Sequence, residues 1–336
     1  MRTDFNKEKL NIKSAAILFG LSLVMAIVTS VLGPGNLAMA LIPMAICAGA
    51  LAALTYFHCD SFRYLKIIAP ICVIAVDWVF NGFFSICGII VVVTSLMIFL
   101  VYEQGWSKLE SALGMSLIIA VMIALVFVII GVSNKEGLSL TEFYTKLYDE
   151  IKVEYVAYMT QIYETVYAGT DTKLPQEADI IYIFDYAIGM IVSFIYIFAF
   201  ALVGVACKVF SFFMKKLSGL KERIAEWRFM PNQVYAYFYA GIEIIGLFIK
   251  SDLSALSLSI VNLGNIFMVI FAYVGLSAIG RMIQERKKRG MSVALYYVCS
   301  IGLAIVFPRV LSFLGVFYCI AASKFQNMRN DNDENS

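Results

Sequence analysis

Three carboxylates and one guanidinium interrupt long apolar stretches of the sequence: Asp77, Asp185, Glu243 and Arg309. A charged side chain is costly in an apolar medium, so such groups pair with one another, reach water or bind a polar ligand. Three acids with one base favour a site that orients a polar or cationic solute, with Arg309 as the counter-ion. The alternative is structural: each carboxylate is hydrated near a surface or bonds a neighbouring helix.

Two amides, Asn262 and Asn265, lie three residues apart and therefore share one face of a helix. Amides in apolar helices commonly join one helix to another by hydrogen bonds, and we favour this interpretation for both. Contact with a bound solute is the alternative, so Asn262 is included among the candidate substrate-binding residues.

The motifs of several enzyme classes are missing. There is no GxxxxGK[ST] loop, and a single histidine, His58, excludes a zinc-binding HExxH motif. Asp77 and Asp185 could form an intramembrane aspartyl pair, but their contexts, AVDWV and IFDYAIG, lack a Gly-x-Gly-Asp element. The seven cysteines form no CxxC pair. We expect no enzymatic activity, no cofactor and no metal; a metal held by His58 with Cys59 and Asp60 is the alternative.

The composition places the chain in a membrane. Of its 336 residues, 61% are hydrophobic and 15% charged, against roughly 45–50% and 25% in soluble domains. Apolar runs at 14–32, 109–132, 180–207 and 253–280 are each long enough to cross about 30 Å of hydrocarbon as a helix. Because alternation with period 2 is missing, helices are favoured over a barrel. The predicted fold is all-α: a polytopic transmembrane helical bundle of about 8–10 membrane segments, with one amphipathic outer helix.

The charge distribution orients these segments. Placing turns at the polar breaks gives ten segments with both termini in the cytoplasm, as the positive-inside rule expects. Most of the 26 basic residues then face inside, and those left outside are Lys135, Lys146, Lys152, Lys173, Lys250 and Arg309. A cleaved signal peptide is the alternative for the N-terminus, but the first apolar run is longer than a typical h-region.

Two apolar units are too long for one span and are interrupted near the middle. Residues 66–102 contain a break at Asn81, and residues 292–323 contain one at Pro308. A single helix over 292–323 would be about 48 Å long, against a hydrocarbon core of about 30 Å. Proline ends the helical hydrogen-bond ladder, and a lone arginine in mid-bilayer is costly. We expect each unit to be a short hairpin; a single kinked helix is the alternative.

The chain therefore divides into five parts. They are a cytoplasmic tail at 1–13, a first membrane half of about five segments at 14–132, an extracytoplasmic segment at 133–178 with an amphipathic helix at 140–168, a second membrane half at 179–322, and a polar tail at 323–336. The inner loops KVFSFFMKKLSGLKERIAEWR and RMIQERKKRG are basic. We interpret them as orientation signals that attract anionic lipid, not nucleic acid.

The long outer segment is predicted to contain a helix that begins at a capping box. Ser139 and Glu142 have the S-x-x-E spacing that satisfies free amide donors at a helix start. Apolar residues then recur every three or four positions, and many of them are tyrosines, which suit an interface between lipid and water. This helix either rests on the outer membrane surface or closes as a lid over an outward-facing pocket, with Tyr155 and Tyr158 as the lid residues.

The second half of the chain contains four short motifs: EWRFMP ahead of a span, VNLGN in the next span, YVGLSAIG before a basic loop, and the closing FPRVLSFLGVF. In these, residues 179–323 resemble the YybS-like family of bacterial membrane proteins. That family is similar to the S components of energy-coupling factor transporters, which bind vitamins or metal ions from outside and lack their own ATPase. The resemblance implies the inner membrane of a bacterial cell. S components usually have six spans, whereas ten segments are counted here.

The candidate charged residues all lie close to the predicted outer turns, which favours a water-accessible cavity that opens outward. The charged residues thus predict capture of a small polar or cationic solute, and the resemblance implies an S-component-like or transport-associated protein. Its expected partners are membrane lipid, this solute and a coupling or scaffold membrane protein. The alternative is a membrane scaffold that transports nothing and binds partner proteins.

Overall fold

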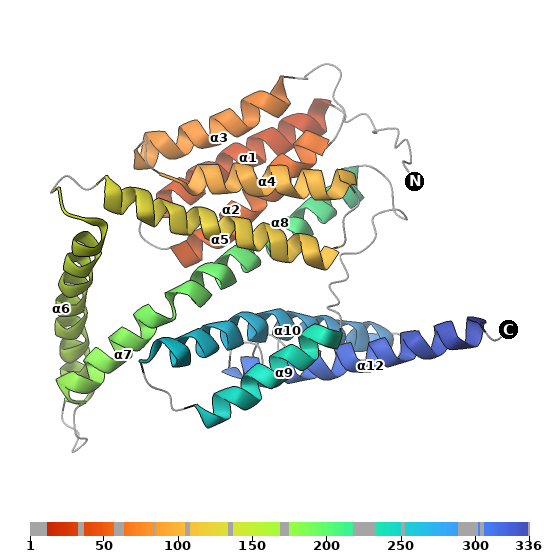
Figure 1. Ribbon diagram of the computed structural model, residues 1–336. Helices are drawn as coiled ribbons and strands as arrows, with labels where there is room; N and C mark the ends of the chain where they lie inside the picture. The colour runs from red at the N-terminus through yellow and green to blue at the C-terminus, as the bar shows by residue number, and fades with distance from the viewer. Residues whose placement is uncertain are drawn as a thin grey trace. The chain divides into compact units, whose positions relative to one another are not determined.

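The computed structural model describes residues 12–32, 37–56, 64–82, 85–104, 108–133, 137–168, 175–217, 233–249, 253–287, 302 and 306–334. Within these ranges the chain forms helices and no strand, so the predicted all-α fold is confirmed. The helices are α1 (Ile12–Leu32), α2 (Leu37–Tyr56), α3 (Leu65–Asn81), α4 (Cys87–Gln104), α5 (Lys108–Val132), α6 (Leu140–Val166), α7 (Glu177–Gly189), α8 (Ile191–Leu217), α9 (Gln233–Phe248), α10 (Ala255–Lys287) and α12 (Pro308–Glu334) (Figure 1).

Six of the described helices are long and apolar enough to cross a membrane: α1, α2, α4, α5, α8 and α10. The chain is therefore a multi-pass membrane protein. The count of ten segments stays a prediction, because α3 has 17 residues, α9 has 16 and the apolar part of α12 covers only Pro308–Ala322.

The unit at 66–102 consists of two helices, as the hairpin prediction expected. α3 ends at Asn81, and Gly82 adopts a φ of 81°, a left-handed conformation that glycine reaches without steric cost. In the other long unit, α12 begins at Pro308, where the missing proline N–H has no consequence because a first-turn amide lacks a helical partner. Most of that unit before Pro308, and also His58, lies outside the described residues.

The apolar run at 180–207 is interrupted at Met190. α7 ends at Gly189 and α8 begins at Ile191, and the N–H of Met190 between them bonds the carbonyls of Tyr186 and Ala187. The helix that meets the length and hydropathy of a membrane span is α8 alone. Asp185 therefore lies on the short α7 and not on the candidate span.

Contacts divide the chain into two compact units, one formed by Met1–Phe127 with Ile195–Phe229 and the other by Val128–Phe194 with Met230–Ser336. In the first unit, α1 packs on α2 and α3, and α4 packs on the same two helices (Figure 1). Every residue of α2 from Cys47 to Leu54 is buried, and most are small. Small side chains let the backbones of α2 and α8 come close together. A Cβ on Gly49 of α2 would lie 2.8 Å from the carbonyl oxygen of Ala206 on α8.

In the second unit, α9, α10 and α12 pack together, and α6 packs on α7. The core of the three-helix group is aromatic, with the rings of Tyr239 and Phe271 stacked at a centroid distance of 5.3 Å. The backbones of α10 and α12 touch at Gly275 and Gly315, since a Cβ on Gly315 would lie 3.0 Å from the nitrogen of Gly275. Glycine is needed there because a side chain would enter the neighbouring backbone.

Candidate functional site

Asp77 belongs to the first unit and is buried, with 2% of its surface exposed. Its Oδ2 accepts a 2.8 Å hydrogen bond from the backbone N–H of Gly88, in the first turn of α4. Its Oδ1 accepts from Asn81 Nδ2 at 2.9 Å and from the Ser30 hydroxyl at 3.4 Å. First-turn amides have no partner within their own helix, and a carboxylate is the preferred acceptor there. Asp77 therefore acts as a structural acceptor that joins α1, α3 and α4.

The second unit contains the other four candidate substrate-binding residues, Asp185, Glu243, Asn262 and Arg309. Among the described residues, no three His, Cys, Asp or Glu side chains come together as a metal site. The four residues lie in three separate places within this unit. Asp185 is on α7, Asn262 is on α10, and Glu243 and Arg309 are on the neighbouring helices α9 and α12.

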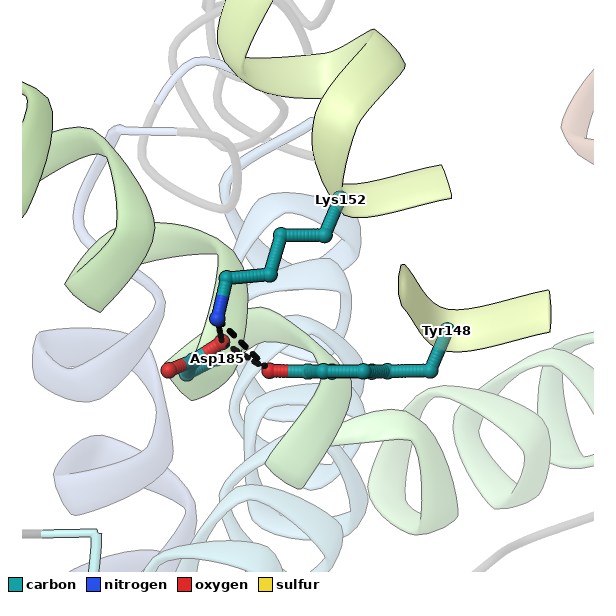
Figure 2. A network of polar contacts seen from close by, with 3 residues as sticks. All are labelled: Tyr148, Lys152 and Asp185. Atoms are coloured by element: carbon teal, nitrogen blue, oxygen red, sulfur yellow. Dashed lines mark hydrogen bonds and ion pairs between the residues drawn. The ribbon is translucent and has the colours of Figure 1, made fainter. Parts of the chain in front are cut away.

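Asp185 on α7 is bound by two side chains of α6, as Figure 2 shows. The Tyr148 hydroxyl donates to Asp185 Oδ1, and the Lys152 ammonium lies 3.7 Å from the same oxygen. Lys152 Nζ also donates to the Tyr148 hydroxyl at 3.4 Å. These three residues form the α6–α7 clasp. The counter-ion of Asp185 is therefore Lys152, which lies on the predicted outer helix.

The clasp changes the acid–base properties of its members. The hydrogen bond to Asp185 raises the pKa of Tyr148, because ionising the hydroxyl would remove that donor and place a second negative charge beside the carboxylate. Burial alone would lower the pKa of Lys152, but the hydrogen bond to Tyr148 and the negative charge of Asp185 outweigh it and raise the pKa. Both side chains thus stay protonated at neutral pH, the form in which the clasp is closed.

α6 begins at the expected capping box: the Ser139 hydroxyl accepts from the Glu142 N–H, and the Glu142 carboxylate accepts from the Ser139 N–H.

The two predicted lid tyrosines differ in their surroundings. Tyr155 packs on Phe184 of α7, with the ring centroids 5.2 Å apart. Tyr158 is 62% exposed. The lid role of this pair stays a prediction.

Asn262 on α10 occupies the break between α7 and α8. Its Nδ2 donates to the Gly189 carbonyl at 2.8 Å and to the Leu258 carbonyl at 2.9 Å, and its Oδ1 accepts from the Ser193 N–H at 3.0 Å. Backbone groups freed by a helix break must find other partners in an apolar medium. The Asn262 amide supplies these partners. Asn262 therefore joins α10 to α7 and α8, which is the role that we favoured from the sequence.

Glu243, on α9, is close to a fully buried polar pair. The Tyr239 hydroxyl shares a 2.8 Å hydrogen bond with the Ser312 hydroxyl of α12, and Ser312 in turn donates to the Arg309 carbonyl at 2.7 Å. Glu243 follows Tyr239 by four residues and so lies on the same face of α9. A Cβ on Gly264 would lie 3.8 Å from Glu243 Oε1, so this oxygen faces α10.

We call Tyr239, Glu243, Arg309 and Ser312 the α9–α12 polar cluster. Sequence reasoning missed Tyr239 and Ser312. The signal for Tyr239 was its position four residues before Glu243, hence on the same helix face. The cluster places an acid that is half-buried and a base that is exposed near buried hydroxyls.

No family model, curated protein or solved structure matches the chain.

Proposed function

We propose that this membrane protein captures a small polar solute at the α9–α12 polar cluster. The observation that carries the proposal is the buried hydrogen bond between Tyr239 and Ser312, with Glu243 one turn from Tyr239 on α9 and Arg309 one turn from Ser312 on α12, in a three-helix group whose core is otherwise apolar. Ionisable groups inside a membrane bundle generally mark a binding site or a pathway. Tyr239 and Ser312 are already hydrogen-bonded to each other, which would hold the site in shape before a ligand arrives.

The charges of the cluster favour a solute that carries both signs. The expected preference for cations depended on three acids, but Asp77 is bonded within the first unit and Asp185 is paired with Lys152. Glu243 and Arg309 remain, one of each charge. The Glu243 carboxylate would accept from an ammonium group, and the Arg309 guanidinium would bind a carboxylate through two parallel hydrogen bonds. A small zwitterion satisfies both.

The wider setting of the proposal comes from the sequence. Both VNLGN, adjacent to the cluster, and FPRVLSFLGVF, which contains Arg309, are among the motifs that resemble the YybS-like family. We propose a bacterial inner-membrane location with cytoplasmic termini, and substrate capture from outside in the manner of S components. In this orientation, Arg309 lies at an outer turn.

The test is thermal unfolding of the detergent-purified full chain with amino acids, polyamines and dicarboxylates. A ligand that binds only the folded protein raises its stability by RT ln(1 + [L]/Kd), about 2.7 kcal/mol at 100 times Kd. We expect the zwitterions to give the largest shift, and Glu243→Gln and Arg309→Gln to remove it. Asp185→Asn is the matched control, because its carboxylate belongs to the α6–α7 clasp.

A ligand that binds Glu243→Gln and Arg309→Gln as well as the parent would disprove this site. If no solute class shifts the unfolding temperature of the parent, the scaffold alternative is favoured. In that case the same variants should leave the capture of partner proteins unchanged.

A further inference from the structure

α6 presents a row of apolar side chains that stay partly exposed in the described part of the chain. None of its residues is buried. Tyr148 and Tyr155 pack on Phe184 of α7, with ring centroids 5.4 and 5.2 Å away. Beside this contact lies the α6 apolar row, whose members are Leu140 at 40% exposure, Leu147 at 36%, Ile151 at 44% and Tyr158 at 62%. Their spacing of seven, four and seven residues places them on one side of the helix.

The row begins at the end of a candidate membrane span. α5 carries apolar residues to Val132, and Ile129, Ile130 and Val132 in its last turns are 53%, 48% and 69% exposed, as expected for side chains that face lipid. α6 starts against that end: a Cβ on Gly131 would lie 2.5 Å from Leu140 Cδ1 and 2.7 Å from Tyr144 Cε2. Leu140 is therefore at the edge of the hydrocarbon, where α5 leaves it.

The direction and charges of α6 fit a bilayer surface. Figure 1 shows α6 running across the direction of α10, a candidate span in the same unit, so α6 lies roughly along the membrane plane. Asp149 lies two residues from both Leu147 and Ile151, which places its charge opposite the row. α6 contains more acids than bases, so neutral headgroups suit it better than anionic ones.

We propose that α6 is an interfacial helix whose apolar row is inserted at the boundary between headgroups and acyl chains of zwitterionic lipid. Helices of this type bury one apolar face about 5–10 Å into the bilayer surface. Tyr158 suits this position because its ring is apolar and its hydroxyl reaches water. The inference is independent of the proposed solute, and it places Tyr158 in lipid instead of over a binding pocket.

The test uses the full chain reconstituted in phosphatidylcholine vesicles, with one tryptophan added at Ile151 or, as the control, at Val153. Val153 is 70% exposed and lies on the opposite side of the helix. The fluorescence of the unsubstituted chain is subtracted. Ile151→Trp is expected to lose more of its added fluorescence to doxyl-labelled phosphatidylcholine, and Val153→Trp more of it to aqueous acrylamide.

Two outcomes would overturn the proposal. Equal quenching of both variants by acrylamide would place the row in water. Protection of Ile151→Trp from both quenchers would show that protein covers it, as a lid on this chain or a second copy. Leu147→Trp, with Lys146→Trp as its control, repeats the comparison one turn earlier and keeps the test decisive if either variant of the first pair fails to fold. An unchanged unfolding temperature establishes that a variant is folded.

Discussion

Asn262 donates a 2.8 Å hydrogen bond to the carbonyl of Gly189, the residue at which α7 ends, and at the same time accepts one from Ser193 in the first turn of α8. One amide thus satisfies both sides of a helix break. Asn262→Leu should leave that carbonyl and N–H without partners in an apolar environment. We expect a loss of about 1–3 kcal/mol in the free energy of unfolding, measured by denaturation in mixed micelles.

The matched control is Asn265→Leu, one turn further along the same helix face. The Asn265 amide contacts the Met190 sulfur at 3.5 Å, and sulfur is a weak acceptor. This variant should lose clearly less stability than Asn262→Leu. Equal losses would show that the helix break does not depend on the Asn262 bonds.

Asp77→Asn should destabilise the first unit. The carboxylate accepts from Gly88, Asn81 and Ser30, and an amide would turn one acceptor oxygen into a donor facing another donor. The expected cost is about 1–3 kcal/mol in the free energy of unfolding. Solute binding per folded molecule should not change, because the proposed site is in the other unit. Folded Asp77→Asn protein that no longer binds the solute would place Asp77 in the site after all.

The parts of the fold that sequence reasoning predicted are those with local signals. The break after Asn81 has a glycine next to it, the start of α12 has Pro308, and the start of α6 has the spacing of Ser139 and Glu142. Each of these signals affects the backbone only within a few residues of its own position in the sequence. Patterns of this range can be recognised in a single sequence.

The features that sequence reasoning missed depend on distant partners. The break at Met190 lies in a continuous apolar run, and the amide that compensates it is 73 residues from Gly189. For Asp77 the sequence left open a ligand site or a bond to a neighbouring helix, and the partner found, the backbone N–H of Gly88, has no signature in the sequence. Naming Arg309 as the counter-ion of the acids likewise overlooked Lys152, because only the packing of α6 on α7 brings that lysine close to Asp185.

Gly275→Ala and Gly315→Ala should each separate α10 from α12. A Cβ on Gly275 would overlap the carbonyl oxygen of Leu311, and a Cβ on Gly315 that of Phe271. Backbone atoms cannot turn aside as a flexible side chain can, so we expect a loss of about 1–3 kcal/mol in the free energy of unfolding for each. Gly280→Ala on α10 is the control, because a Cβ there meets no atom within 4 Å. If all three variants unfold alike, the close contact is not a source of stability.

The α6–α7 clasp should open in alkali. Groups whose pKa is raised on folding stabilise the folded state while they are protonated, and this contribution is lost as the pH rises through the folded pKa. Tyr148 and Lys152 both have a raised pKa, from ordinary values of 10.0 and 10.5, so contact between α6 and α7 should be unaffected at neutral pH and weaken only above about pH 10.

NMR titration of protein with isotope-labelled tyrosine would measure this directly, with Tyr148→Phe identifying the resonance. Asp185→Asn should lower the pKa of Tyr148 toward its ordinary value, because the hydrogen bond to the carboxylate is its main cause. Lys152→Met should raise the pKa further, since the ammonium favours the ionised hydroxyl. A Tyr148 that titrates alike in the parent and both variants would mean that the clasp does not form in the membrane protein, and α6 would then be held to α7 by its aromatic contacts alone.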